Sequence, residues 1–138
     1  MNNRYLIFLS VCISLALMCS CDEKVKLSEE IDITGFWEGE YNIHGRSDID
    51  PQYMNLLVKK DGTITNEAQW FNGVRINLGT WELNGNAFKY QVSNVVGGEN
   101  PNPLMGTAIL DPSGKLIDGI WQNLSGSNSG TFELIKRQ

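Results

Sequence analysis

Residues 33–45, ITGFWEGEYNIHG, carry the pattern that decides the fold. Alternate positions hold Trp37, Gly39, Tyr41 and Ile43, and Glu38 lies between them on the opposite side of an extended chain. A period of two is typical of a strand with one buried face and one face in water. Glycine among large aromatics permits sharp bending and close approach of a neighbouring backbone. The stretch therefore predicts a strongly coiled, half-buried strand.

Turn signals divide the chain that follows. Glycine is common, with 14 residues, and proline is scarce, with 4, so glycine marks most of the turns. Asx-Gly pairs, which tolerate the positive φ of tight hairpins, stand at residues 61–62, 72–73 and 84–85. A Pro-containing turn follows at Asp111–Gly114, and a longer polar loop at Ser125–Gly130.

The segments between these turns alternate apolar and polar residues, as in Met54, Leu56 and Val58. We find no helical period in any long window after residue 33. The pattern predicts an all-β fold with eight strands, at residues 33–43, 53–60, 63–70, 74–83, 87–95, 104–111, 115–123 and 130–137.

Most connections between these strands are short, so neighbours in sequence should pair antiparallel. Eight such strands avoid exposed edges by closing into a single antiparallel up-and-down (meander) β-barrel. A two-sheet sandwich in meander order is the alternative. Two connections, at residues 44–52 and 96–103, are longer than the others.

The first twenty residues have the order of a secretory signal. Arg4 precedes an apolar run from Tyr5 to Met18, and the small residue Ser20 follows. The run is short for a membrane span. We expect residues 1–20 to be a cleaved signal peptide; an uncut anchoring helix is the alternative.

The end of this segment, Ser20-Cys21 followed by Asp-Glu-Lys, resembles the lipobox of bacterial lipoproteins. In that family a small residue precedes a cysteine that is acylated and becomes the new N-terminus. The resemblance implies lipidation of Cys21 and a membrane-anchored lipoprotein of the bacterial cell envelope, in the outer membrane. The acidic residues directly after the cysteine resemble an export signal to the cell surface.

Processing at Cys21 would remove Cys12 and Cys19, so chemistry through sulfur is excluded from the mature domain. The chain after residue 20 carries 10 basic and 16 acidic residues, a net charge of −6, which argues against a nucleic-acid partner. Residues 21–32 are rich in charge and lack an apolar period, as in a flexible tether. The barrel then occupies residues 33–138.

The stretch TGFWEGEY looks like the Gly-x-Trp opening strand of the calycin superfamily, which includes lipocalins and avidin-like barrels. The likeness continues in Gly79-Thr-Trp81 and Gly119-Ile-Trp121. Residues 116–137 also resemble the closing hairpin of small lipocalin-like bacterial lipoproteins. This resemblance implies an eight-stranded barrel that binds a small apolar or amphipathic ligand.

Residues typical of catalysis or metal binding are sparse. His44 is the one histidine, and no nucleophile, zinc or phosphate-loop motif is present. Glu38 and Glu40 share a predicted outward face. Asp48 and Asp50 are only a weak indication of a calcium-binding site. We therefore expect no catalytic residue, no metal and no cofactor, and a protein that is not an enzyme.

Aromatic and aliphatic residues at inward positions are the remaining functional candidates. In a barrel of eight strands they either fill the interior or line a cavity for one small ligand. The predicted ligand-binding residues are Trp37, Tyr41, Leu56, Val58, Phe88, Tyr90, Trp121 and Phe132.

Two functions follow from these alternatives. A cavity, opening beside the long loops, would make the protein a carrier or receptor for a small hydrophobic or amphipathic molecule. A filled barrel would act through its surface on an envelope protein, as an inhibitor, immunity or accessory protein. Trp70 and Phe71, at a predicted hairpin tip, would suit such a surface.

Overall fold

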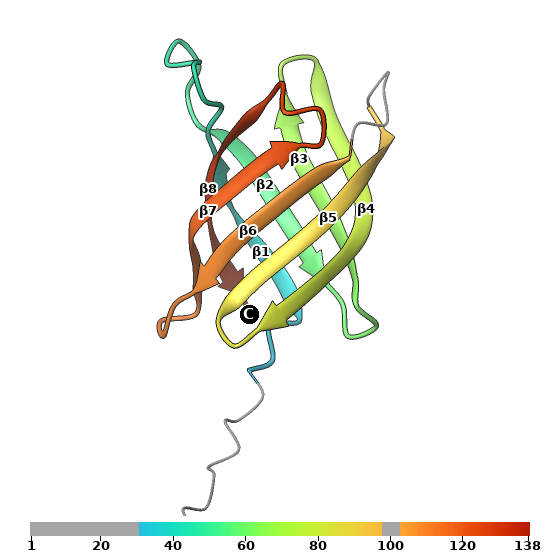
Figure 1. The fold of residues 1–138 in the computed structure, drawn as a ribbon, viewed down its shortest axis with the longest axis vertical. Coiled ribbons are helices and arrows are strands. Elements are labelled where there is room, and N and C mark those ends of the chain that lie inside the picture. Colours follow the sequence, from blue (N-terminus) through green and yellow to red (C-terminus); the bar gives the residue numbers. More distant parts are fainter. Residues whose placement is uncertain (1–30, 98–102) are drawn as a thin grey trace, which may run out of the picture. The chain divides into compact units, whose positions relative to one another are not determined.

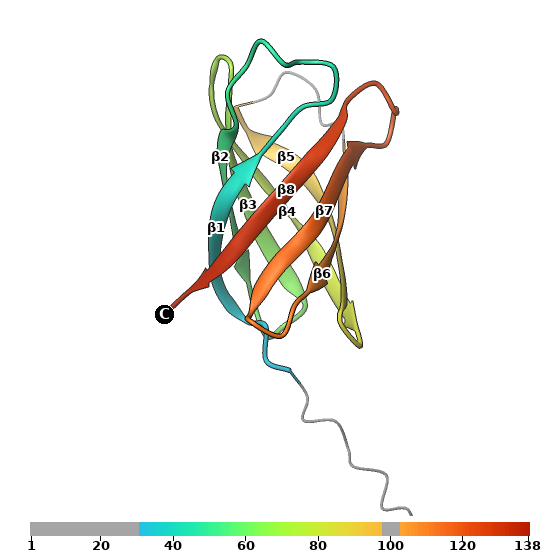
Figure 2. The same cartoon turned by 90° about the vertical axis from the view of Figure 1, so that its left-hand side faces the viewer.

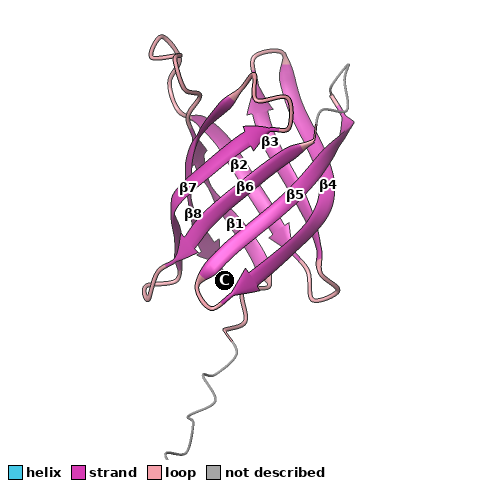
Figure 3. Ribbon diagram, viewed as in Figure 1, coloured by secondary structure: helices cyan, strands magenta, loops and turns pink. Residues whose placement is uncertain are grey.

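The computed structural model describes residues 31–97 and 103–138, which form strands and no helix (Figure 3). The predicted signal peptide, Cys21 and most of the tether lie outside the described residues. The strands are β1 (Gly35–Tyr41), β2 (Gln52–Val58), β3 (Thr63–Trp70), β4 (Gly73–Asn84), β5 (Ala87–Val96), β6 (Leu104–Leu110), β7 (Lys115–Asn123) and β8 (Ser129–Arg137). The predicted fold class is confirmed.

The eight strands close into one barrel in sequence order (Figures 1 and 2). Each strand pairs antiparallel with the next, and β8 returns to β1, where Tyr41 lies opposite Phe132. This closing ladder excludes the two-sheet sandwich. No edge strand remains, so every strand has a backbone partner on both sides.

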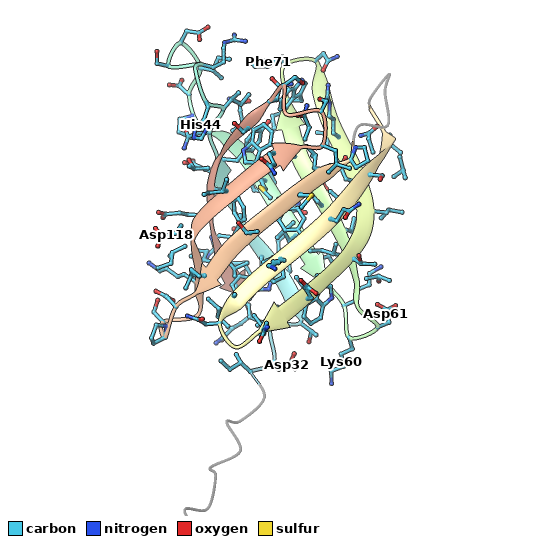
Figure 4. The ribbon with its side chains drawn as sticks, viewed as in Figure 1. Asp32, His44, Lys60, Asp61, Phe71 and Asp118 are labelled. Atoms are coloured by element: carbon cyan, nitrogen blue, oxygen red, sulfur yellow. The ribbon has the colours of Figure 1, made fainter. Side chains whose placement is uncertain are left out.

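The ends of the barrel differ in the length of their loops. One end holds the segments 42–51, 71–72 and 124–128, together with Gly97 and Pro103, and we call it the open end. The opposite end, which we call the closed end, holds the short turns at 59–62, 85–86 and 111–114, and the chain also enters the barrel there. Figure 4 shows the two ends by their labels, with His44 and Phe71 at the open end and Asp32, Lys60 and Asp61 at the other.

Trp37, the aromatic residue of the Gly-x-Trp stretch, fills the closed end of the barrel. Trp37 is 1% exposed, and its indole Nε1 donates a hydrogen bond of 2.8 Å to the carbonyl oxygen of Ile33. The ammonium group of Lys136 lies 6.0 Å from the centre of the Trp37 ring and donates to the carbonyl oxygen of Asp32. The entering chain is thus fixed across this end of the barrel.

Glycines meet large aromatics on neighbouring strands. Tyr90, Gly106, Trp121 and Gly130 are consecutive partners across β5, β6, β7 and β8. A Cβ on Gly106 would lie 2.0 Å from the Tyr90 ring, and one on Gly130 would lie 2.6 Å from the Trp121 indole nitrogen. The alternation of missing and large side chains therefore lets the rings lie over neighbouring strands inside a narrow barrel.

Residues Asp32–Gln138 form a compact unit that contains the whole closed ladder. The buried apolar core, from Ile33 to Leu134, also lies within it. The unit therefore has what a domain needs to fold by itself.

The structure shows the environments of two side chains on β2 and β3. The period of two places Asn55 on the face of β2 opposite Met54 and Leu56, yet it is only 8% exposed, and its side-chain amide donates to the Tyr53 hydroxyl at 3.5 Å. Trp70 and Phe71 were predicted at a hairpin tip, and exposure was left open; of the two, only Phe71 is exposed, at 53%. The Trp70 side chain instead packs against the core inside the barrel.

Candidate ligand-binding site

A cavity of about 330 Å³ occupies the open half of the barrel. This volume lies at the lower end of the range for small-molecule sites, roughly 300–1,000 Å³. Strands β1 to β7 all contribute to its walls, and Gly97 and Asn128 line it from the loops. The barrel is thus packed at one end and hollow at the other.

Aromatic side chains form one wall of the cavity. The Tyr41 and Trp70 rings are parallel within 5°, with centres 6.2 Å apart, and Trp121 meets Tyr41 edge-on at 5.7 Å. The Tyr41 hydroxyl donates to the carbonyl oxygen of Gln69 at 2.5 Å, and the Trp121 indole donates to that of Asn42 at 3.0 Å. Backbone acceptors therefore hold the polar tips of Tyr41 and Trp121, a geometry that positions their rings to pack against a ligand.

Asparagines form the second wall and are linked across four strands. The Asn94 amide nitrogen donates to the Asn77 side-chain oxygen at 3.3 Å, and Asn77 donates in turn to Asn66 at 2.8 Å. Asn66 donates to the backbone oxygen of Asn55 at 3.0 Å. The chain of hydrogen bonds satisfies amides that would otherwise be costly to bury, and it fixes their orientation toward the cavity.

Arg75 on β4 is the one charged side chain among the described residues that line the cavity. Its neighbour in the sheet is Ala68, which is opposite Met54 on the next strand. The guanidinium carbon lies 4.4 Å from the centre of the Trp70 ring. The cavity thus combines aromatic, amide and cationic groups.

Two tyrosine hydroxyls of the cavity stay neutral over the physiological range. Burial raises the pKa of Tyr41 to about 12, and the charge of Arg75 opposes part of this effect. Burial alone raises the pKa of Tyr90, to a still higher value. Both groups can therefore act as hydrogen-bond donors or acceptors but not as anions at neutral pH.

The structure divides the predicted ligand-binding residues between the two halves of the barrel. Three of them, Tyr41, Tyr90 and Trp121, line the cavity. The other five, Trp37, Leu56, Val58, Phe88 and Phe132, are buried in the core but do not line it. All eight point inward, as the period of two predicts, but the period does not give their height along the barrel axis.

Most of the polar wall was not predicted from the sequence. Asn66, Asn77, Arg75 and Asn94 were not singled out, although the structure places them around one cavity. Their signal was a polar residue at an inward position of β3, β4 or β5. A polar side chain at such a position is costly to bury in a packed core, so in a barrel it indicates a cavity.

The other polar candidates lie on the surface. His44 is exposed, with Nδ1 3.2 Å from the Ser129 hydroxyl oxygen. Asp48 forms an ion pair with Arg46, at 3.0 Å from the guanidinium Nε. Within residues 31–97 and 103–138, no group of three or more acidic, histidine or cysteine side chains could hold a metal ion.

Comparisons with models of known protein families, with curated proteins and with solved structures gave no match. The described part of the chain contains no helix with the length and apolarity that crossing a membrane requires.

Proposed function

We propose that the protein is a lipid-anchored lipoprotein of the bacterial cell envelope, lipocalin-like in type, whose barrel binds a small hydrophobic or amphipathic ligand. The observation that supports binding most directly is the cavity of about 330 Å³ at the open end. Its aromatic wall suits an apolar body, and its amides suit a few polar groups on the same molecule.

The proposed anchor is the acylated Cys21, and the mature chain begins there. The chain enters the barrel at the closed end, where Lys136 contacts Asp32. The described chain therefore enters the barrel at the end opposite the cavity mouth. This arrangement suits a receptor or carrier that exchanges its ligand with the surroundings of the membrane.

Mass spectrometry of the full-length protein from its native host tests the anchor. We expect a mature chain that starts at Cys21 and carries acyl groups, and a Cys21→Ala variant that keeps residues 1–20. An unmodified Cys21 in the mature protein would contradict the lipoprotein assignment.

Native mass spectrometry of residues 22–138, purified gently from the same host, tests the binding function. The matched control is Ala68→Trp, which places a large side chain in the cavity between Met54 and Arg75. We expect a bound small molecule of defined mass on the native chain and none on the variant. A native chain without bound mass, or the same mass on both chains, would argue against a ligand in this cavity.

A second candidate function is recognition of an envelope protein through the open end. Exposed apolar side chains gather there, with Phe71 at 53%, Val96 at 56% and Leu124 at 55%. An apolar rim of this kind favours contact with a partner protein. Pull-downs with the native chain and with a Phe71→Ser/Leu124→Ser variant would test it; a partner held by the native chain alone would support this function.

A further inference from the structure

The arginines of the described chain differ in their partners. Arg46 pairs with Asp48, and Arg137 pairs with Glu38. The Arg75 side chain makes no ion pair or hydrogen bond to a described residue, and its buried Nε has no partner among them. A buried guanidinium nitrogen without an acceptor is unfavourable, so it calls for a functional explanation.

Among the described residues, no carboxylate lines the cavity beside Arg75. The described residues that line it include aromatic, aliphatic and amide side chains, but no aspartate or glutamate. The surrounding amides and the Tyr90 hydroxyl offer hydrogen-bond donors but no negative charge. The positive charge is therefore not balanced within the described walls of the cavity.

Packing holds the guanidinium group in place. It lies over the Trp70 ring, and Trp70 itself packs against Tyr41 and Trp121. Guanidinium donors lie in the plane of the group, so a guanidinium that lies over an aromatic face can still present its fork of donors to an oxyanion. Preorganisation of this kind is typical of a binding group.

We propose that the ligand of this cavity is a small anion, with an apolar or aromatic body and a carboxylate, sulfonate or phosphate group that pairs with Arg75. The apolar body packs against Trp70 and Trp121, and the asparagine amides bind the remaining oxygens. This inference rests on the proposed binding function, and it narrows the ligand class from amphipathic molecules in general to anionic ones.

A matched pair of fluorescent probes tests it on residues 22–138. Anilinonaphthalene-8-sulfonate is anionic, and N-phenyl-1-naphthylamine has the same ring system without the sulfonate. Titrations use the native chain, Arg75→Gln, Arg75→Lys and the filled variant Ala68→Trp, each checked for native circular dichroism.

We expect both probes to bind the native chain and neither to bind Ala68→Trp in the cavity. Arg75→Gln should weaken the sulfonate probe by about 10- to 100-fold, the range of a charge-assisted hydrogen bond, and change the neutral probe by less than about threefold. Arg75→Lys keeps the charge but loses the planar fork, so it should retain part of the affinity for the sulfonate.

The outcomes separate the two proposals. If Arg75→Gln weakens both probes equally or neither, Arg75 is structural, the anion inference is overturned and the binding function stands. If neither probe binds the native chain, or both bind Ala68→Trp unchanged, the binding function itself fails.

A measurement on the native chain alone covers the case in which the Arg75 variants do not fold. Displacement of N-phenyl-1-naphthylamine compares naphthalene-1-sulfonate with the neutral naphthalene-1-sulfonamide, which is close to it in size. Stronger displacement by the sulfonate supports the inference, and equal or weaker displacement overturns it.

Discussion

Glycines on the inner face of the barrel leave room for aromatic rings. Gly106 is buried, and an added Cβ would lie 2.0 Å from the Tyr90 ring. We expect Gly106→Ala to displace the Tyr90 ring and to lower the free energy of unfolding by about 1–3 kcal/mol, as overpacking does. Urea unfolding measures the change.

The control for this substitution is Gly45→Asn in an exposed loop. Gly45 has a φ of 77° and no atom near its added Cβ, and asparagine tolerates that backbone conformation. Its unfolding midpoint should stay close to that of the native chain. Equal stability of Gly106→Ala and Gly45→Asn would refute the packing account.

Buried tyrosines make stability depend on alkaline pH. An unfolded tyrosine ionises near pH 10.0, whereas the folded Tyr41 has a pKa of about 12. The unfolded state therefore loses its proton first, and the free energy of unfolding should fall as the pH rises from about 10 to about 12. Tyr90, whose pKa burial also raises, contributes in the same direction.

Thermal unfolding between pH 8 and pH 11.5 checks this dependence. The double substitution Tyr41→Phe/Tyr90→Phe should flatten the alkaline slope, because it removes both titrating groups. The control is Tyr53→Phe on the outer surface, where the side chain is 43% exposed. The same slope in the double variant and in the native chain would contradict the assignment.

At the scale of the strands, the asparagine chain ties β2, β3, β4 and β5 together inside the barrel. Asn66 both accepts from Asn77 and donates to the Asn55 backbone oxygen. Asn66→Leu conserves volume approximately but leaves these two groups without a partner, so it should cost about 2–4 kcal/mol of unfolding free energy.

A double-mutant cycle tests whether the two asparagines act together. The pair Asn66→Leu/Asn77→Leu removes both partners of one hydrogen bond, so its cost should be smaller than the sum of the two single costs. Guanidinium unfolding of the four chains gives the coupling. Simple additivity would show that the inner hydrogen bonds are not coupled.

The strands could be predicted from sequence because their signals are local. The turn signals and the period of two placed β3 and β7 at their observed bounds and the other strands within a few residues. The height of Trp37 or Tyr90 along the axis was not predictable, because it depends on the tilt and stagger of all eight strands. Asn66, Arg75 and Asn77 were missed for the same reason: whether an inward polar residue faces a cavity or the packed half also depends on its height along the axis.

The whole molecule combines a packed half, which supplies stability, with a hollow half, which is proposed to bind the small-molecule ligand. Leu116 is fully buried near the closed end, whereas Leu104 lines the cavity. Leu116→Ala should lower the free energy of unfolding by about 2–5 kcal/mol and leave the affinity for N-phenyl-1-naphthylamine unchanged. Leu104→Ala should change that affinity at a smaller cost in stability.

Parallel measurements of unfolding and of probe binding test this division. An affinity loss in Leu116→Ala, measured where the variant is fully folded, would show that the two halves are coupled.

The four tryptophans allow the central claim, a ligand site inside the open half of the barrel, to be tested directly. Trp70 and Trp121 line the cavity, while the Trp37 and Trp81 indoles donate to Ile33 and Lys59 near the closed end. The measurement is a nitrogen–proton NMR spectrum of the indole groups during titration with N-phenyl-1-naphthylamine. The account predicts that the signals of Trp70 and Trp121 shift and that those of Trp37 and Trp81 stay in place. Shifts confined to Trp37 and Trp81, or no shift at any indole, would contradict it.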